Sequence, residues 1–145
     1  MKIRDIINAK GSVFTIEPSK TVREAIKRLV EWNIGALPVC VEPGKLLGII
    51  TERDVLRLCA RDDLQATSAL RVEEVMTKDL VIGLLDDDVD YVMSVMTQRR
   101  IRHLPVLEAG QLVQIISIGD VVKARHDSTE TEIRFLRDYI AGAPA

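Results

Sequence analysis

Ile34-Gly-Ala-Leu-Pro-Val-Cys40 is matched 67 positions later by Ile101-Arg-His-Leu-Pro-Val-Leu107. Downstream, Gly44-Lys-Leu-Leu-Gly-Ile-Ile-Thr-Glu-Arg-Asp54 is matched at an offset of 66 by Gly110-Gln-Leu-Val-Gln-Ile-Ile-Ser-Ile-Gly-Asp120. The second half of the chain therefore repeats the first. Because stacked arrays need three or more units, a repeat that occurs twice predicts two halves packed on each other with pseudo-twofold symmetry.

Each half is expected to contain a short strand, a helix, two strands joined by a tight turn, and a second helix. In the first half, Val13–Ile16 predicts the first strand, and apolar residues at helical spacing from Val22 predict the helix. Residues 36–41 and 46–50 are β-rich runs on either side of a Pro-Gly turn signal. The predicted fold class is α/β (α+β), with two β-α-β-β-α repeats. A unit of roughly sixty residues is marginally stable alone, so each half is expected to bury its sheet against the other.

The repeat divides the chain into four segments. We assign residues 1–62 to the first repeat, 63–70 to a polar linker, 71–127 to the second repeat and 128–145 to a helical tail. In the tail, Ile133, Leu136 and Ile140 fall on one helical stripe. This stripe predicts that the tail packs on another surface, such as a second subunit.

Composition excludes several classes of function. The formal net charge is −2 with both signs interspersed, so the chain lacks the basic surface that nucleic acid or an anionic membrane requires. Aromatic residues make up only 3%, which leaves few platforms for base stacking. The N-terminus has no apolar segment behind its charges, and no run is long enough to span a bilayer. A cytoplasmic protein that binds neither nucleic acid nor membrane is therefore expected.

The most informative residues are Thr51-x-x-Asp54 and Ser117-x-x-Asp120, each between an apolar strand and a helix. This pattern is a helix capping box, and taken singly it is explained by capping alone. The same geometry also suits a nucleotide, because the carboxylate accepts from ribose hydroxyls while the hydroxyl and the helix N-terminal amides face phosphate. Both interpretations remain open at this point.

Leu-Pro-Val, a short turn and Gly-x-x-Thr-x-x-Asp together resemble CBS domains, named for cystathionine beta-synthase, and two copies extend to about residue 126. The resemblance implies a pseudo-symmetric pair with two clefts between the halves. In that family the clefts often hold adenosine-containing ligands, namely AMP, ADP, ATP, NAD(H) or S-adenosylmethionine, with the motif's Asp on the ribose. It also implies a homodimer in a flat, disc-like assembly.

Carried onto this sequence, the resemblance implies binding residues in both clefts, each drawing on the opposite half. The Asp54 cleft is expected to use Thr51, Arg53, Asp54, Thr77, Lys78, Ile82, Ile101, Arg102 and His103. The Asp120 cleft is expected to use Lys10, Val13, Ile34, Gly35, Ser117 and Asp120.

The second half departs from the pattern in two places. Gln114 stands where the first half has Gly48, and a side chain there is expected to crowd the base or the adjoining strand. Gly83-Leu-Leu85 occupies the first-strand position, so that strand is expected to end early. With Arg102 on its side, the Asp54 cleft is predicted to bind a phosphorylated ligand more tightly than the Asp120 cleft.

Three classes of function remain. The first is a regulatory nucleotide-binding module acting on an unknown protein partner, for example as the accessory regulator of a purine-nucleotide enzyme. The second is an enzyme, which is not expected, because the two histidines, His103 and His126, have no metal or triad partners at suitable spacing and no catalytic constellation is found. The third is a structural dimerisation module without ligand. No catalytic cofactor is expected.

Overall fold

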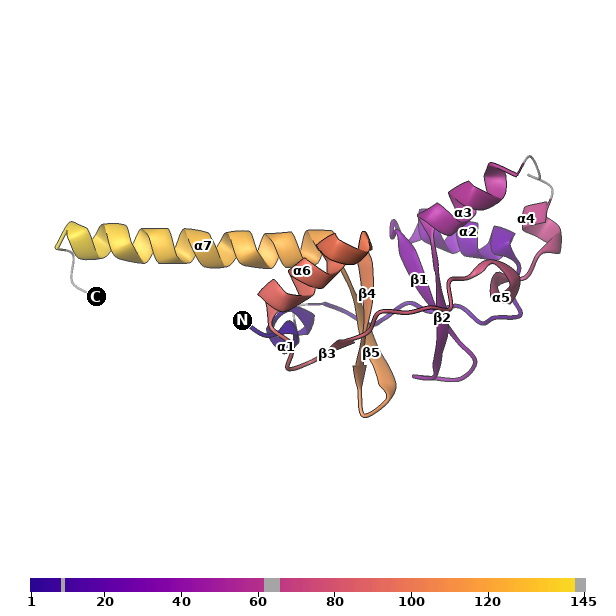
Figure 1. Cartoon of the computed structure of the whole chain (residues 1–145), viewed down its shortest axis with the longest axis horizontal. Helices are drawn as coiled ribbons and strands as arrows, with labels where there is room; N and C mark the ends of the chain where they lie inside the picture. Colours follow the sequence, from indigo (N-terminus) through magenta and orange to yellow (C-terminus); the bar gives the residue numbers. More distant parts are fainter. Residues whose placement is uncertain (9, 62–65, 143–145) are drawn as a thin grey trace.

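Two sheets, one from each half of the sequence, form the centre of the computed structural model, which describes residues 1–8, 10–61 and 66–142 (Figure 1). In the first half, β1 (Ala36–Cys40) pairs antiparallel with β2 (Leu46–Thr51). In the second, β4 (His103–Glu108) pairs antiparallel with β5 (Gln111–Ser117), and β3 (Gly83–Leu84) runs parallel to β4. The hairpin predicted in each half is confirmed.

Along the chain, each hairpin is preceded by one helix of its own repeat and followed by another. In the first half these are α2 (Val22–Glu31) and α3 (Glu52–Cys59), and in the second they are α6 (Val89–Arg99) and α7 (Ile118–Ile140). Val22, Ala25 and Leu29 form the buried face of α2, because residues three and four apart share one side of a helix, whereas Val30 is exposed. The side chain of Thr21 accepts a hydrogen bond from the backbone N–H of Glu24 and so caps this helix.

Two short helices are exchanged between the halves. The N-terminal α1 (Ile3–Ile7) packs into the core of the second half, where Ile3 has no exposed surface. In return, α5 (Val72–Val75) packs into the core of the first half, and Val72 is equally buried. All five residues of β1 are buried, so both faces of this strand are covered, and Ile49 of β2 lines a cavity together with residues of β4. The buried residues form separate cores in the two halves, and an exchanged helix completes each of them.

Three segments of the sequence interpretation compare differently with the structure. Val13–Ile16 does not form a strand: only Ile16 makes a single parallel bridge, to Val39, while the Phe14 ring stacks on Trp32 at 4.5 Å. In the second half, β3 has two residues and so ends early, as predicted. Residues 62–65 of the predicted boundary and linker lie outside the described residues, and the helix α4 (Ala66–Ala69) follows them.

The tail continues α7 without a break and projects from the body of the molecule (Figure 1). Its stripe is exposed to solvent: Ile133 is 45% exposed, Leu136 55% and Ile140 82%. A lone helix of this kind gains little from its own backbone, since most helical stability in proteins comes from packing an apolar face. The projecting stripe is thus a surface that a second subunit can cover.

We predict a homodimer that uses this stripe. Sedimentation at micromolar concentration should give about twice the chain mass of 16.2 kDa. Leu136→Glu should weaken the dimer at least tenfold, because burying one leucine contributes roughly 1.5–3 kcal/mol. The control is Arg134→Glu, about 200° around the helix from Leu136, which should leave the dimer intact. A monomeric wild type would contradict the prediction.

Candidate functional site

Two cavities lie between the halves. The first, about 510 Å³, contains Asp54 and Thr51 on its wall and is called the Asp54 cleft. The second, about 430 Å³, is lined by Lys10 and Ser117 and is called the Asp120 cleft, because Asp120 binds Lys10 at its wall. Each cavity is lined by side chains from both repeats. The predicted arrangement of two clefts between the halves is therefore present.

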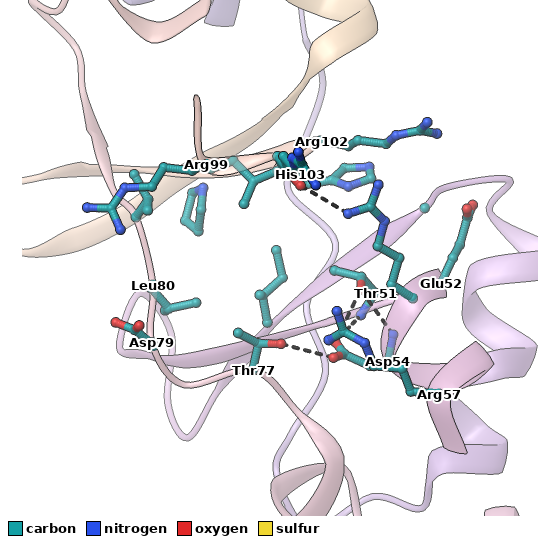
Figure 2. Close-up of a pocket in the computed structure, with 17 residues that line it drawn as sticks. Thr51, Glu52, Asp54, Arg57, Thr77, Asp79, Leu80, Arg99, Arg102 and His103 are labelled. Carbon is teal, nitrogen blue, oxygen red and sulfur yellow. Dashed lines mark hydrogen bonds between the residues drawn. The ribbon is translucent and has the colours of Figure 1, made fainter. Parts of the chain in front are cut away.

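In the Asp54 cleft, the carboxylate is held by the start of α3. The backbone N–H of Thr51 donates to Oδ2 of Asp54 at 2.9 Å, and the Thr51 hydroxyl oxygen accepts from the Asp54 backbone N–H at 3.3 Å. The hydroxyl of Thr77, which lies in the second repeat, donates to Oδ1 at 2.9 Å (Figure 2). Asp54 is 6% exposed. The capping interpretation is thus correct in geometry, and among residues 1–8, 10–61 and 66–142 the partner of Oδ1 is a neutral hydroxyl.

Asp120 caps α7 in the same way but has a charged partner. Its Oδ2 accepts from the backbone N–H of Ser117 at 2.8 Å and from Nζ of Lys10 at 2.6 Å. Burial alone would raise the pKa of the Asp120 carboxyl, but the hydrogen bonds from Lys10 and Ser117 and the Lys10 charge outweigh burial and lower it. At neutral pH this carboxylate is therefore ionised and already paired.

Thr77 and Lys10 occupy equivalent positions of the two repeats, 67 residues apart. A hydroxyl therefore meets Asp54 where an ammonium group meets Asp120. A ligand hydroxyl that reaches Oδ1 of Asp54 competes with one neutral hydrogen bond, whereas at Asp120 the partly buried ammonium of Lys10 offsets the carboxylate charge and so weakens any further hydrogen bond that the carboxylate accepts. The two carboxylates are unequal before any ligand is present.

Gln114 is held by a hydrogen bond to the N-terminal segment, and the expectation that it crowds a ligand base stays a prediction. At the equivalent Gly48, a Cβ atom would lie 2.7 Å from the sulfur of Met76 and 2.8 Å from the carbonyl oxygen of Thr77, so only glycine fits there. Gln114 is instead buried, and its Nε2 donates to the carbonyl oxygen of Gly11 at 2.8 Å. Its side chain lines the Asp120 cleft and ties the N-terminal segment to β5.

Arginines distinguish the Asp54 cleft. Five of them line it: Arg53, Arg57, Arg99, Arg100 and Arg102. Figure 2 shows Arg99 and Arg102 on the opposite side of the cleft from Asp54 and Arg57. Within residues 1–8, 10–61 and 66–142, none of the five forms a salt bridge with a carboxylate. The cleft therefore presents guanidinium groups that are available to an anion.

Arg100 also adopts an unusual backbone conformation. It ends α6 with φ of 54°, in the left-handed region that costs a residue with a side chain roughly 1–2 kcal/mol. Its carbonyl oxygen accepts from Nη1 of Arg53 at 3.0 Å, a contact between the two halves at the edge of the cleft. Asn33, 67 residues earlier, has the same conformation with φ of 52°, and asparagine tolerates it better. Strain of this kind is typical of binding sites.

Most of the predicted residues meet at the clefts. Those that line a cavity are Thr51, Arg53, Asp54, Thr77, Ile101, Arg102 and His103 in the Asp54 cleft, and Lys10, Ile34, Gly35 and Ser117 in the Asp120 cleft. Asp120 is not part of the lining, but its carboxylate binds the ammonium group of Lys10, which is. Besides Asp120, three predicted residues line neither cavity: Val13, which is half-buried, and Lys78 and Ile82, which are exposed.

Sequence reasoning missed several lining residues. Glu52, Arg57, Arg99 and Arg100 line the Asp54 cleft, and Asn33 lines the other. The signal that could have found two of them is the repeat itself, since Asn33 and Arg100 are equivalent positions directly before the Leu-Pro motif segments. Arg57 had no such signal, because one turn of α3 separates it from the motif.

Within the described ranges, no group of three or more His, Cys, Asp or Glu side chains is placed to hold a metal ion. The helices of those ranges also include none that is long and apolar enough to cross a membrane.

The CBS domain family model matches residues 3–61 and 72–127 of the chain. The chain belongs to the CBS domain family. The CBS-domain containing protein ATU1752 from Agrobacterium tumefaciens shares 40% identity with a TM-score of 0.81, over 86% of this chain and 99% of that one. Both the family resemblance and the mixed α/β fold class are therefore confirmed.

Other CBS proteins are also similar. The mitochondrial CBS domain-containing protein CBSX3 of Arabidopsis thaliana is 36% identical over 140 residues, which cover 93% of this chain and 67% of that protein. The CBS domain pair of protein MJ0100, solved in complex with 5-methylthioadenosine and S-adenosyl-L-methionine, is 28% identical with a TM-score of 0.77, over 88% of this chain and 98% of that one. Inosine-5'-monophosphate dehydrogenase of Methanocaldococcus jannaschii matches 78% of this chain, which corresponds to 22% of that enzyme.

The Lys10–Asp120 pair generates a prediction about acid stability. An acid whose folded pKa is lowered contributes stability above its unfolded pKa, near 4, and that stability is lost as pH falls through the folded pKa. Lys10→Met should therefore lower the free energy of unfolding by about 1 kcal/mol at pH 7, and the difference from wild type should shrink below about pH 4.

The matched control is Lys2→Met, which removes a more exposed ion pair with Asp88 at 3.2 Å. It should cost less than about 0.5 kcal/mol at pH 7. Urea unfolding from pH 2.5 to 7 makes the comparison, and equal pH profiles for Lys10→Met and wild type would contradict it.

Proposed function

We propose that this CBS pair is a regulatory module that binds an adenosine-containing nucleotide in the clefts between its repeats and catalyses no reaction. The observation that carries the proposal is the Asp54 cleft, where a buried carboxylate at a helix start shares a cavity of about 510 Å³ with guanidinium groups that form no salt bridge within the described residues. That volume is typical of small-molecule sites. The adenosine-type ligands in the related MJ0100 pair support the same class of ligand.

The groups in the Asp54 cleft fit the two ends of a nucleotide. Ribose hydroxyls can donate to Oδ1 of Asp54, displacing the hydroxyl of Thr77, and charge-assisted bonds of this kind are the stronger ones. Arg102 and its neighbours face the cavity from the second repeat and can bind phosphate through their planar forks. In this proposal the capping box fixes the carboxylate, and the arginines fix the phosphate end.

The charge of the lining favours a phosphorylated ligand. Five arginines face three carboxylates in the Asp54 cleft, those of Glu52, Asp54 and Asp79. An excess of positive charge in a partly enclosed cavity attracts anions and disfavours cations. AMP, ADP, ATP and NAD(H) are therefore better candidates than the sulfonium cation S-adenosylmethionine.

The Asp54 cleft is proposed to be the tighter of the two. Its motif has the close-packed Gly48, its carboxylate has a neutral partner, and its arginines carry no ion pairs in the described residues. In the Asp120 cleft, the ammonium of Lys10 is committed to Asp120 and Gln114 occupies part of the wall. One charge-assisted hydrogen bond contributes roughly 1.5–3 kcal/mol, which corresponds to tenfold or more in affinity.

Regulation requires that the ligand prefer one arrangement of the halves or of two subunits, because a ligand shifts an equilibrium only by its differential affinity. The regulated partner stays a prediction, as does a cytoplasmic location. A purine-nucleotide enzyme is one candidate partner, in view of the match to part of inosine-5'-monophosphate dehydrogenase. A structural dimerisation module is the second candidate function, and both capping boxes and the exposed α7 stripe favour it.

Calorimetry with ATP on Asp54→Asn and Asp120→Asn tests the proposal. Asn retains much of the helix cap, so Asp54→Asn should melt close to wild type, whereas Asp120→Asn also loses the ion pair with Lys10 and should be about 1 kcal/mol less stable. We expect Asp54→Asn to lose the tighter binding event and Asp120→Asn to keep it. The opposite result would reverse the assignment of the clefts. Wild type that binds no adenine nucleotide, with no rise in melting temperature at millimolar ligand, would favour the structural module.

Arg100→Gly tests whether Arg100, which has a strained backbone conformation, contributes its guanidinium to ligand binding. Glycine adopts a positive φ freely, so the ligand-free variant should gain about 1 kcal/mol in stability. It should also bind ATP in the Asp54 cleft several-fold more weakly, because a guanidinium is lost. The control is Asn33→Gly, which makes the same change in the equivalent position and should leave the tighter event unchanged. A stabilised Arg100→Gly with full affinity would remove Arg100 from the site.

A further inference from the structure

The two clefts share one wall. Gly35, directly before β1, and His103, the first residue of β4, line both cavities. They are in close contact: a Cβ atom at position 35 would lie 2.9 Å from Cε1 and 3.0 Å from Nε2 of the His103 ring. The imidazole therefore packs against bare backbone, and a side chain at Gly35 would displace it.

Gly35 of the first repeat and His103 of the second form this wall, but only the second repeat contributes an imidazole to it. The residue equivalent to His103 in the first half is Ala36, which is 3% exposed and lines only the Asp120 cleft. A methyl group cannot reach across the wall or carry a proton. Only the second repeat therefore has a histidine at this position, and its ring lines both cavities.

Charged groups of both clefts surround this ring. From the Asp54 side they are Glu52 of α3 and Arg102, directly before β4, and from the Asp120 side they are Lys10 and Asp120 of α7. Burial lowers the pKa of His103 most strongly, Lys10 and Arg102 lower it further, and Glu52 and Asp120 oppose them. In the ligand-free protein at neutral pH, the ring is therefore uncharged, with one nitrogen as donor and the other as acceptor.

We propose that His103 is a binding residue shared by both clefts, and that its imidazole takes up a proton when a phosphate group binds on either side. This inference rests on the proposed function and adds a means of communication between the clefts. A phosphate adds negative charge beside the ring and so favours the imidazolium form. The proton comes from solvent, and no bond in the ligand is broken.

Coupling between the clefts follows from this shared proton. If ligands in both clefts favour the charged form of His103, the first ligand to bind protonates the ring and thereby raises the affinity of the other cleft for the second ligand. Repulsion between two bound anions opposes this effect, and an imidazolium between them screens that repulsion. The coupling between the clefts therefore becomes more favourable as pH falls from 8 to 6.

Proton uptake is measured by titrating the full chain with ATP at pH 6.5 in two buffers that differ in ionisation enthalpy. The phosphate of the nucleotide titrates in the same range, so the relevant quantity is the difference between wild type and His103→Gln. Wild type should take up more protons per ATP than His103→Gln does, by roughly 0.3 or more. His103→Ala gives a second test, since the first repeat tolerates alanine at the equivalent position. The control is His126→Gln, an exposed histidine on α7 that pairs with Glu130.

Coupling is measured by comparing the weaker binding event of wild type with the event that remains in Asp54→Asn. At pH 6 the Asp120 cleft should bind ATP several-fold more tightly when the Asp54 cleft is filled than when it is empty. At pH 8 this ratio should be smaller. This pH dependence should vanish in His103→Gln and persist in His126→Gln. ATP binding with the same proton uptake in wild type, His103→Gln and His103→Ala would overturn the inference while leaving the proposed function standing. A single binding event would overturn the coupling, and no binding at all would overturn both proposals.

Discussion

Burial of Ile3 and Val72 in the half that does not contain the rest of their repeat is the constraint on which the site depends. Each residue leads a short helix that fills a gap in the opposite core, and neither half has a complete core without it. The chain after each helix must then return to its own repeat. On the way back it passes the junction of the halves, where it brings Lys10 to Asp120 and Thr77 to Asp54. The clefts are thus formed by the same crossings that complete the cores.

A small number of replacements makes two copies of one motif into unequal sites. Gly48 allows the strand to lie against Met76 and Thr77, whereas Gln114 binds the carbonyl oxygen of Gly11 through its side-chain amide. The first repeat has Lys10 at the position where the second has Thr77. It has Ala36 where the second has His103. Each change affects side chains at the cleft and leaves the hairpins intact, since both show the same antiparallel pairing. The fold therefore tolerates asymmetry at the positions where ligand chemistry is decided.

The hairpins, the capped helices and the family were predictable from the sequence, because each depends on local pattern and on a repeat that can be aligned by eye. The exchange of α1 and α5 was not, because burial of Ile3 against the far half is a long-range contact without a local signature. The strand expected at Val13–Ile16 was wrong for a related reason: the segment crosses between the halves and retains only one bridge. In the site, motif residues were found, but Arg57 and the double role of His103 depend on how the halves meet.

The single helix from Ile118 to Ile140 begins at the Asp120 cleft, so a small tilt of its first turn displaces its far end by a larger distance. Its first turn is fixed by Ser117 and Asp120 at the cleft, residues as far as Ala124 pack on the core of the second half, and the rest of its 23 residues extends away from the body. At 1.5 Å per residue such a helix is about 35 Å long. A tilt of about 5° at the cap would move the far end by about 3 Å, which is comparable to the width of a methyl group. A change too small to alter the packing of either core would therefore displace Ile140 far enough to alter its fit against a neighbouring surface.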